Sequence, residues 1–208
     1  MFSALKPVKQ HKKITPQQTA QSTAQRHVVS YRPPDPFGRD AKGDTAQCKV
    51  VGWEHKNNKY KSVALSYEKA LDNAVDKAHK HVLMAPRLGI SVDGHTDKWI
   101  EDWDNHINKN KVDLFAASFG YAIESLATNI YIPPAPSGFN IELQGVRGAT
   151  RPDIILKEKG NDIAWLDITA ENSEGHIWKK GPPFWDQQDH ASKIAYPSLD
   201  NKSLTFME

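Results

Sequence analysis

The sequence predicts a mixed α/β fold, and three observations support this fold class. Apolar residues recur at helical spacing in three stretches between residues 66 and 129. Short segments that alternate apolar and polar residues precede and follow them, which is typical of strands. The chain has 208 residues, of which 38% are hydrophobic. This length suffices for one domain with a core and an appendage.

Residues 1–45 are predicted to form a flexible basic arm or linker. The stretch is rich in Gln, Thr, Lys and Pro, and its few large apolar residues cannot offset the entropy lost on ordering. Residues 1–44 hold 8 Lys and Arg against 3 Asp and Glu, whereas the rest of the chain holds 19 against 22. Both a plain solvated linker and a polyanion-binding arm fit this composition. The body itself lacks the basic excess of a general nucleic-acid binder.

Three further features of the sequence concern a signal peptide, a membrane-spanning segment and cysteine pairs. The basic first residues are not followed by an apolar stretch, so we expect no cleaved secretory signal peptide. No apolar run approaches the roughly 20 residues that a membrane-spanning helix needs, so we expect no membrane partner. The single cysteine, Cys48, excludes an intrachain disulfide.

Residues 46–208 are expected to form the folded domain, beginning with a lobe of a hairpin and helices over residues 46–110. Residues 47–54 and 60–65 are predicted as two strands around a turn-forming Lys-Asn-Asn cluster. A helix follows from Ser66, and a second helix begins at Thr96 and Asp97. Their apolar stripes are Tyr67, Ala70, Leu71, Ala74, Val75, Ala78 and Val82, and then Trp99, Ile100, Trp103 and Ile107.

Residues 111–208 are expected to hold the functional core. A third helix, 112–129, is apolar on most sides, which indicates a buried helix. Strands are predicted over 141–146, 152–156 and 163–170. The polar segment 157–162 turns between the last two, so they should form a hairpin. A short helix over 173–180 and a last strand over 192–196 complete the prediction.

Two aspartates on the predicted hairpin are candidate metal ligands. Asp153 begins one strand and Asp167 lies late in the next, so the hairpin can place the two carboxylates side by side. Asp167 and Thr169 should project to the same face, because side chains alternate along a strand. Converging carboxylates bind hard divalent cations such as Mg²⁺ or Mn²⁺, and such an ion activates water for attack on a phosphodiester.

Glu124 is an isolated carboxylate in the apolar third helix. Small residues stand three, four and seven positions away: Ala127, Gly120 and Ala117. Burying an unpaired carboxylate is costly, so a metal ion or an arginine such as Arg151 should compensate for it. Small neighbours would also let the carboxylate approach the sheet.

The ordered set Gly120-x-x-x-Glu124, Arg151-Pro-Asp153, hairpin and Asp167-x-Thr169 resembles the PD-(D/E)xK, or restriction endonuclease-like, nuclease superfamily. The resemblance covers about residues 112–197. It implies a restriction endonuclease-like αβββαβ core, preceded here by extra N-terminal helices. By the same resemblance, Glu124, Asp153 and Asp167 would be ligands of Mg²⁺ or Mn²⁺.

One departure from the family pattern concerns its lysine. The second motif usually ends in lysine, where this sequence has Thr169. Some members supply the lysine from the following helix, and Lys180 is the first candidate here, with Lys179 second. His176 stands four residues before Lys180, on the same face of the predicted helix. It is a candidate to contact phosphate or to carry a proton.

The resemblance also suggests a biological role. The motifs RPDI, WLDIT and GHI-x-x-K resemble those of toxin-type nucleases at the carboxyl ends of bacterial polymorphic toxins and secreted effectors. It implies an endonuclease that acts on DNA more than RNA, is secreted without a cleaved signal peptide and works in the cytoplasm of a target cell. It also implies a cognate immunity protein that covers the acidic cleft.

Four alternatives remain open at this point. The same fold can serve as a non-catalytic module that binds nucleic acid or a protein. Alternatively, a buried Asp–Arg–Thr network stabilises the hairpin, with Arg151 as counter-ion. A metal-free ribonuclease would use His176 and His190. A histidine-based metal nuclease would use pairs such as Asp93 with His95 and Asp102 with His106, but the spacing lacks an HNH-like pattern.

Overall fold

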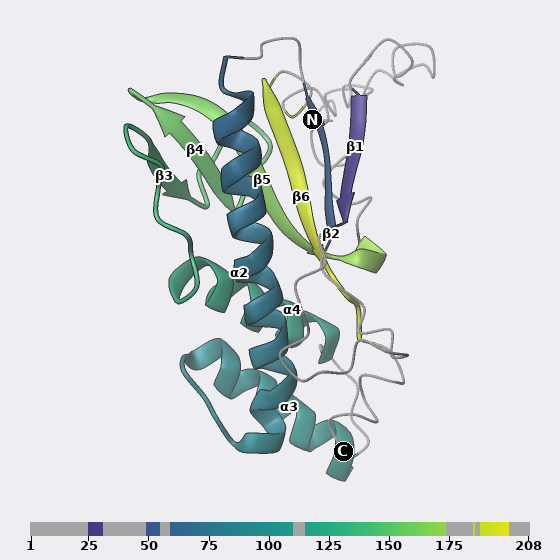
Figure 1. The fold of residues 1–208 in the computed structure, drawn as a ribbon. Coiled ribbons are helices and arrows are strands. Elements are labelled where there is room, and N and C mark those ends of the chain that lie inside the picture. The colour runs from purple at the N-terminus through teal and green to yellow at the C-terminus, as the bar shows by residue number, and fades with distance from the viewer. Residues whose placement is uncertain are drawn as a thin grey trace, which may run out of the picture.

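The structure is a computed structural model that describes residues 25–30, 49–54, 59–109, 115–173, 185 and 188–199; for 25–30, 49–54, 107–109 and 115 it describes the backbone alone. Among the described residues, two of three helices contact one mixed sheet and the third packs against those two helices, which confirms the mixed α/β class. The helices are α2 (Lys61–Leu88), α3 (Gly94–Lys109) and α4 (Phe115–Asn129). The long helix α2 runs along the sheet, and α3 and α4 lie beyond one end of it (Figure 1).

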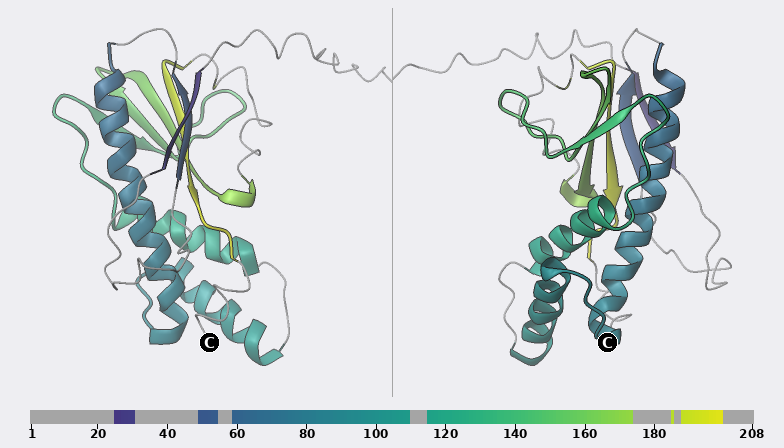
Figure 2. Two further views of the ribbon diagram at one scale, coloured as in Figure 1. Left: turned by 45° about the vertical axis from the view of Figure 1, so that its right-hand side comes forward. Right: turned by 90° about the vertical axis from the view of Figure 1, so that its left-hand side faces the viewer.

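The sheet has the strand order β1-β2-β6-β5-β4-β3 (Figure 2). Strands β5 and β6 are parallel, and every other neighbouring pair is antiparallel. A parallel pair requires a crossover connection, so the chain leaves the sheet between β5 and β6. The strands are β1 (Gln25–Ser30), β2 (Lys49–Glu54), β3 (Asn140–Leu143), β4 (Ile154–Glu158), β5 (Asn161–Ala170) and β6 (His190–Tyr196).

The predicted hairpin of 47–54 with 60–65 is wrong in its second half. Strand β2 is present, but α2 begins at Lys61, and β2 pairs with β1 and β6 instead. Ala64 is buried one turn before Tyr67, so the apolar stripe of the helix extends back through this segment. A short run containing Tyr60 and Val63 resembles a strand locally. The helical spacing of apolar residues over the longer segment determines the structure that forms.

Strand β1 lies within residues 1–45, which the composition had predicted to be a flexible arm. Its six residues pair along the whole of β2. Backbone pairing at a sheet edge satisfies N–H and C=O groups whatever the side chains are, so a segment with few large apolar residues can still be ordered there. The other residues of the predicted arm lie outside the described part of the chain.

Helix α3 begins two residues earlier than predicted, because Asp93 caps it. The Asp93 carboxylate accepts a hydrogen bond from the Thr96 N–H at 2.8 Å, and the Thr96 hydroxyl accepts one from the Asp93 N–H at 2.9 Å. This reciprocal pair is a capping box. Ser125 of α4 donates to the other Asp93 carboxylate oxygen at 2.6 Å, so the cap also joins α3 to α4.

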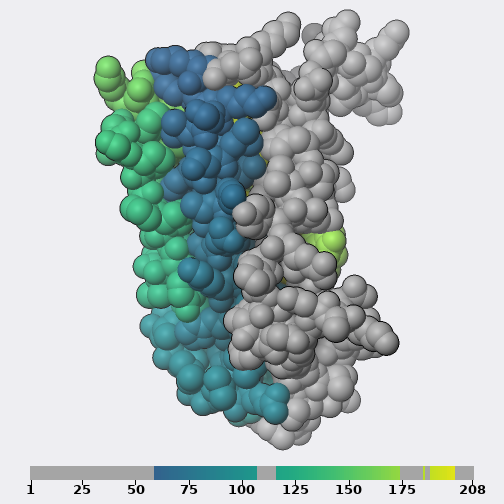
Figure 3. Space-filling view, in the orientation of Figure 1, coloured from purple at the N-terminus to yellow at the C-terminus, as the bar shows by residue number. Residues whose placement is uncertain are grey.

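The two faces of the sheet have different coverings. On one face, Ile154, Leu166 and Ile194 belong to the main core, which includes the apolar stripes of α2 and α4. Figure 3 shows α2 lying across the molecule on this side. On the other face, Trp165 packs against Trp185 with its ring centre 5.5 Å away. Trp99 and Trp103 are buried, as their place in the predicted apolar stripe requires, and Trp165 is buried as well.

The predicted hairpin of β4 and β5 and the last strand are confirmed, with shifted ends. Strand β3 is shorter than predicted, because the chain turns at Gln144, whose φ is 53°. The predicted helix over 173–180 falls mostly on residues 174–184, which lie outside the described residues. Among the described helices, none has the length and apolar character needed to cross a membrane.

Candidate active site

A cavity of about 930 Å³ lies between α4, the loop that joins β3 to β4, and the carboxyl-terminal half of β5. Its α4 wall holds Glu124 and Tyr121 together with small residues that include Ala117 and Gly120. Its other walls include Asp153, Asp167, Thr169, Val146, Arg151 and Tyr196. The predicted site residues that the structure describes therefore all line one cavity.

The hairpin register places the two aspartates opposite each other. Ile154 pairs with Leu166, so Asp153, one residue earlier, lies across from Asp167. Both carboxylates are buried, at 8% and 6% exposure. The Ile168 backbone N–H donates to Asp153 Oδ2 at 2.8 Å, which fixes this carboxylate against β5.

The electrostatics of Asp153 show that the three carboxylates influence one another. Burial raises the pKa of Asp153 well above its usual range, and the charges of Asp167 and Glu124 raise it further. The hydrogen bond from the Ile168 N–H acts in the opposite direction but does not cancel these effects. Mutual repulsion of this kind arises when carboxylates share a small volume. We call Glu124, Asp153 and Asp167 the acidic site.

Glu124 reaches the acidic site because α4 approaches the sheet closely. A Cβ atom placed on Gly120 would lie 2.6 Å from the Tyr196 hydroxyl at the end of β6. Any larger residue at position 120 would therefore force α4 or Tyr196 to move. Gly120 and Glu124 are four residues apart on one helix face, so the close approach at Gly120 places Glu124 at the cavity.

Gln144 joins two members of the acidic site and was not predicted. Its side-chain nitrogen Nε2 lies 2.5 Å from Glu124 Oε1 and 3.0 Å from Asp153 Oδ1. Its backbone N–H donates to the Asp153 carbonyl oxygen at 2.9 Å. The only sequence signal was an amide side chain close after a strand, which is too common to be informative.

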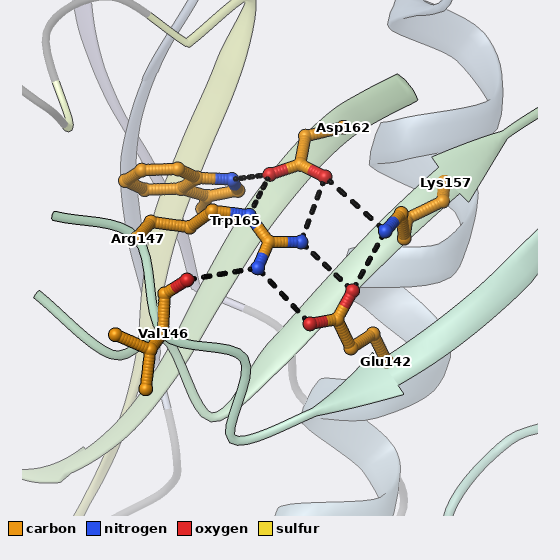
Figure 4. A network of polar contacts seen from close by, with 6 residues as sticks. All are labelled: Glu142, Val146, Arg147, Lys157, Asp162 and Trp165. Carbon is orange, nitrogen blue, oxygen red and sulfur yellow. Dashed lines mark hydrogen bonds and ion pairs between the residues drawn. The ribbon is translucent and has the colours of Figure 1, made fainter. Parts of the chain in front are cut away.

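The loop that carries Gln144 is anchored by Arg147 (Figure 4). The Arg147 guanidinium donates two hydrogen bonds to Glu142, at 2.8 and 3.0 Å, and two to Asp162, at 2.6 and 3.0 Å. Lys157 donates to Glu142 at 2.7 Å, and the Trp165 indole donates to Asp162 at 2.9 Å. The hydrogen bonds from Arg147 and Lys157 lower the pKa of Glu142 to about 2. The loop is thus held against both β3 and β5.

Lys193 is a second residue that the sequence prediction missed. It is fully buried in β6 and pairs in register with Asp167 on the adjacent strand β5. Residues paired in register project to the same face of a sheet, so Lys193 lies beside Asp167 on the face opposite α2. It is not part of the cavity wall. Cross-strand pairing between segments 26 residues apart gives no local sequence signal.

The structural alternative with Arg151 as counter-ion is not supported. Arg151 lines the cavity but is exposed, and no ion pair joins it to the acidic site among the described residues. Thr169 is 4% exposed and lines the cavity, as the alternation of β5 predicted.

The histidine-based alternatives are not supported by the residues that the structure describes. His190 Nε2 lies 2.6 Å from Glu68 Oε2 of α2, and both side chains are 3% exposed, so His190 faces the main core and not the cavity. Asp93 caps α3, and Asp102 pairs with Lys98 of the same helix. His176, Lys179 and Lys180 lie outside the described residues, and their predicted roles stay predictions.

The donor set of the acidic site fits a hard divalent cation. Three carboxylates and one amide converge, and carboxylate and amide oxygens are the ligands that Mg²⁺ and Mn²⁺ take. Within the described part of the chain, no three His, Cys, Asp or Glu side chains already form a compact metal cluster. The Gln144 nitrogen stands between Glu124 and Asp153, so an ion would have to replace this hydrogen-bonded contact.

Comparisons with known proteins identify no relatives. No family model, no curated protein and no solved structure matches the chain. The function must therefore be argued from the site itself.

Proposed function

We propose that the protein is a metal-dependent nuclease of the PD-(D/E)xK type. The observation that carries this proposal is the convergence of Glu124, Asp153 and Asp167 on one cavity, although they come from a helix, a loop end and a strand. The described elements follow one another as α4, β3, β4, β5 and β6, which supports the proposal for the αβββ part and the last strand of the αβββαβ order. The second helix of that order would fall on residues outside the described part of the chain.

In this proposal the acidic site would hold Mg²⁺ or Mn²⁺. The bound ion would supply Lewis-acid activation of water and neutralise charge on the scissile phosphate. Asp153 Oδ2 is held by the Ile168 N–H, and Oδ1 accepts the hydrogen bond from Gln144 that an ion would replace. Thr169 lines the same wall and can donate a hydrogen bond to a phosphate oxygen. Lys180 or Lys179 would assist the attacking water.

Lys193 has a positioning role in this proposal. The lysine is buried and pairs in register with Asp167, so its charge would offset part of the negative charge that three carboxylates bring together. It does so without reaching the cavity, so it does not contact the substrate.

Two groups in the cavity wall favour a nucleic acid as the substrate. Tyr121 is 60% exposed and offers an aromatic face on which a base can stack. Arg151 is exposed beside the acidic site and can bind a backbone phosphate. We therefore keep DNA as the first substrate to test and RNA as the second.

A plasmid-nicking assay tests the proposal. We expect cleavage in Mg²⁺ or Mn²⁺, none in EDTA, and a loss of at least about 100-fold in Asp167→Asn. Asn140→Ala, which changes an exposed residue outside the cavity, is the matched control. Inertness of the wild-type protein towards plasmid, linear and single-stranded DNA and towards RNA would support the non-catalytic binding module instead.

The effector role belongs to the same proposal. An acidic cavity whose described wall carries one basic residue, Arg151, is a natural target for a basic inhibitor surface. A cognate immunity protein would cover this cavity in the producing cell, and the nuclease would act in the cytoplasm of a target cell. Growth arrest on cytoplasmic expression, relieved by Asp167→Asn, is the expected result.

A further inference from the structure

The side chain of Gln144 contacts two carboxylates of the acidic site. One amide nitrogen serves both Glu124 Oε1, at 2.5 Å, and Asp153 Oδ1, at 3.0 Å. An amide NH₂ group has two hydrogens, so both contacts can form at once. Gln144 therefore occupies the space between two carboxylates where a cation would bind.

The backbone of Gln144 is held in an unfavourable conformation. Its φ of 53° lies in the left-handed region, which costs a residue with a side chain about 1 kcal/mol or more. The turn is kept by the hydrogen bond from the Gln144 N–H to the Asp153 carbonyl and by the anchoring of Arg147 three residues later. The neighbour Gly145 has no room for a Cβ, which would lie 2.7 Å from Ile155 Cδ1. The loop therefore holds the backbone of Gln144 next to the acidic site.

We propose that Gln144 is a fourth ligand of the divalent cation, and that it binds the ion through its amide oxygen. This inference rests on the proposed function. A half-turn of the amide exchanges Nε2 and Oε1 without changing the shape of the side chain or moving the backbone. In the metal-free site the amide nitrogen donates hydrogen bonds to two carboxylates. When a cation replaces that contact, the amide oxygen can bind the cation. The same residue thus stabilises the acidic site before and after the ion binds.

Isothermal titration of the full chain with Mn²⁺ tests the assignment. Gln144→Met keeps the length of the side chain but removes both the donor and the oxygen. We expect it to weaken Mn²⁺ binding about tenfold, while Asn140→Ala, an exposed amide on β3, leaves the affinity unchanged. Mn²⁺ binding by Gln144→Met that equals or exceeds that of the wild type would overturn the assignment, because a residue that merely fills the space would give that result.

The preference for Cd²⁺ over Mn²⁺ gives an independent readout. A thioether prefers soft cations, so Gln144→Met should raise the ratio of Cd²⁺ to Mn²⁺ affinity if residue 144 touches the ion. An unchanged ratio would overturn the assignment. If Gln144→Met does not fold in EDTA, Gln144→Asn tests the assignment instead. It keeps the amide but is one methylene shorter, so it should also bind Mn²⁺ more weakly than the wild type.

These outcomes separate the ligand assignment from the nuclease proposal. A wild-type protein that binds one Mn²⁺ but cuts no nucleic acid contradicts the nuclease and leaves Gln144 as a ligand. A wild-type protein that cuts DNA, together with a Gln144→Met variant of unchanged Mn²⁺ affinity, contradicts the ligand assignment alone. A wild-type protein that binds no divalent ion overturns both.

Discussion

At the scale of a single residue, the carboxyl group of Asp153 is where the proposed metal site would lower the stability of the metal-free protein. Burial and the two neighbouring carboxylates raise its pKa, so the ionised form is disfavoured in the absence of a cation. A cation placed among the three carboxylates would reverse that balance. Sites that need such a charge arrangement are commonly less stable than their neutral variants.

Asp153→Asn should therefore stabilise the metal-free protein. We expect an increase of about 1 kcal/mol in the free energy of unfolding in EDTA at pH 8, together with loss of Mn²⁺ binding. Urea denaturation in EDTA measures the first effect and calorimetry the second. A variant that is destabilised in EDTA would show that Asp153 is a structural residue.

Lys193→Met separates a positioning role from a structural one. Replacing a buried charge by an apolar side chain of similar length is often neutral or stabilising, so we expect an unchanged or raised melting temperature. We expect kcat to fall at least tenfold with KM unchanged, because Lys193 is buried beside Asp167 on the adjacent strand and is not part of the cavity wall. A melting temperature that falls while kcat is retained would contradict this role.

The residues of the acidic site could be predicted from sequence because each carries a local signal. Asp153 and Asp167 flank a recognisable hairpin turn, and Glu124 interrupts an apolar helix. Gln144 and Lys193 could not be predicted in this way. The place of Gln144 depends on a left-handed turn, and that of Lys193 depends on the pairing of β5 with β6. Neither feature follows from residue type or spacing alone.

At the scale of elements, α2 carries a row of acids on its sheet-facing side. Glu68 and Asp72 are buried one turn apart, and Asp76 follows one turn later. Burial, with the charges of Asp76 and Glu68, raises the pKa of Asp72 to about 7. Asp72 Oδ1 has no hydrogen-bond partner among the described residues. This helix face is therefore less stable when Asp72 is ionised.

Asp72 should make stability depend on pH. Its folded-state pKa of about 7 exceeds the ordinary value of 3.8, so the folded protein binds the proton more tightly than the unfolded chain. Stability should fall as pH rises between these values and level off above about pH 7. Asp72→Asn should gain about 1–2 kcal/mol over the wild type at pH 8 and nothing at pH 4. Equal urea midpoints at pH 8 would contradict this.

The contact between α4 and β6 gives a test of helix placement. Gly120→Ala puts a methyl group against the Tyr196 hydroxyl, so α4 should shift away from the sheet. We expect a loss of about 1–3 kcal/mol in stability and a larger proportional loss of cleavage, since Glu124 moves with the helix. The double variant with Tyr196→Phe removes the hydroxyl and should recover most of both. No recovery would show that the helix is displaced for another reason.

The elements themselves were predictable to different degrees. The three helices have long apolar stripes, which local sequence reveals well. The segment at 60–65 was predicted as a strand, because its few residues fit both periods and only the buried Ala64 joins it to the helix. Strand β1 lacked an apolar signal because its order comes from backbone pairing with β2.

At the scale of the whole molecule, the two faces of the sheet have different surroundings. One face packs on α2 and carries the main core, and the other presents Asp167 and Lys193 beside a cavity. The helix α4 at the end of the sheet closes the cavity and contributes Glu124. The fold class followed from sequence patterns, but the strand order β2-β6-β5 joins distant segments and had to come from the structure.

The most direct test of the account is a crystal of the protein grown or soaked in Mn²⁺ and measured at a wavelength where manganese scatters anomalously. We predict one strong anomalous peak, about 2.1 Å from oxygens of both Asp153 and Asp167. Glu124 should reach it directly or through a water molecule. A saturated crystal without a peak there, or with carboxylates that keep their metal-free contacts, would contradict the proposed metal site and with it the nuclease.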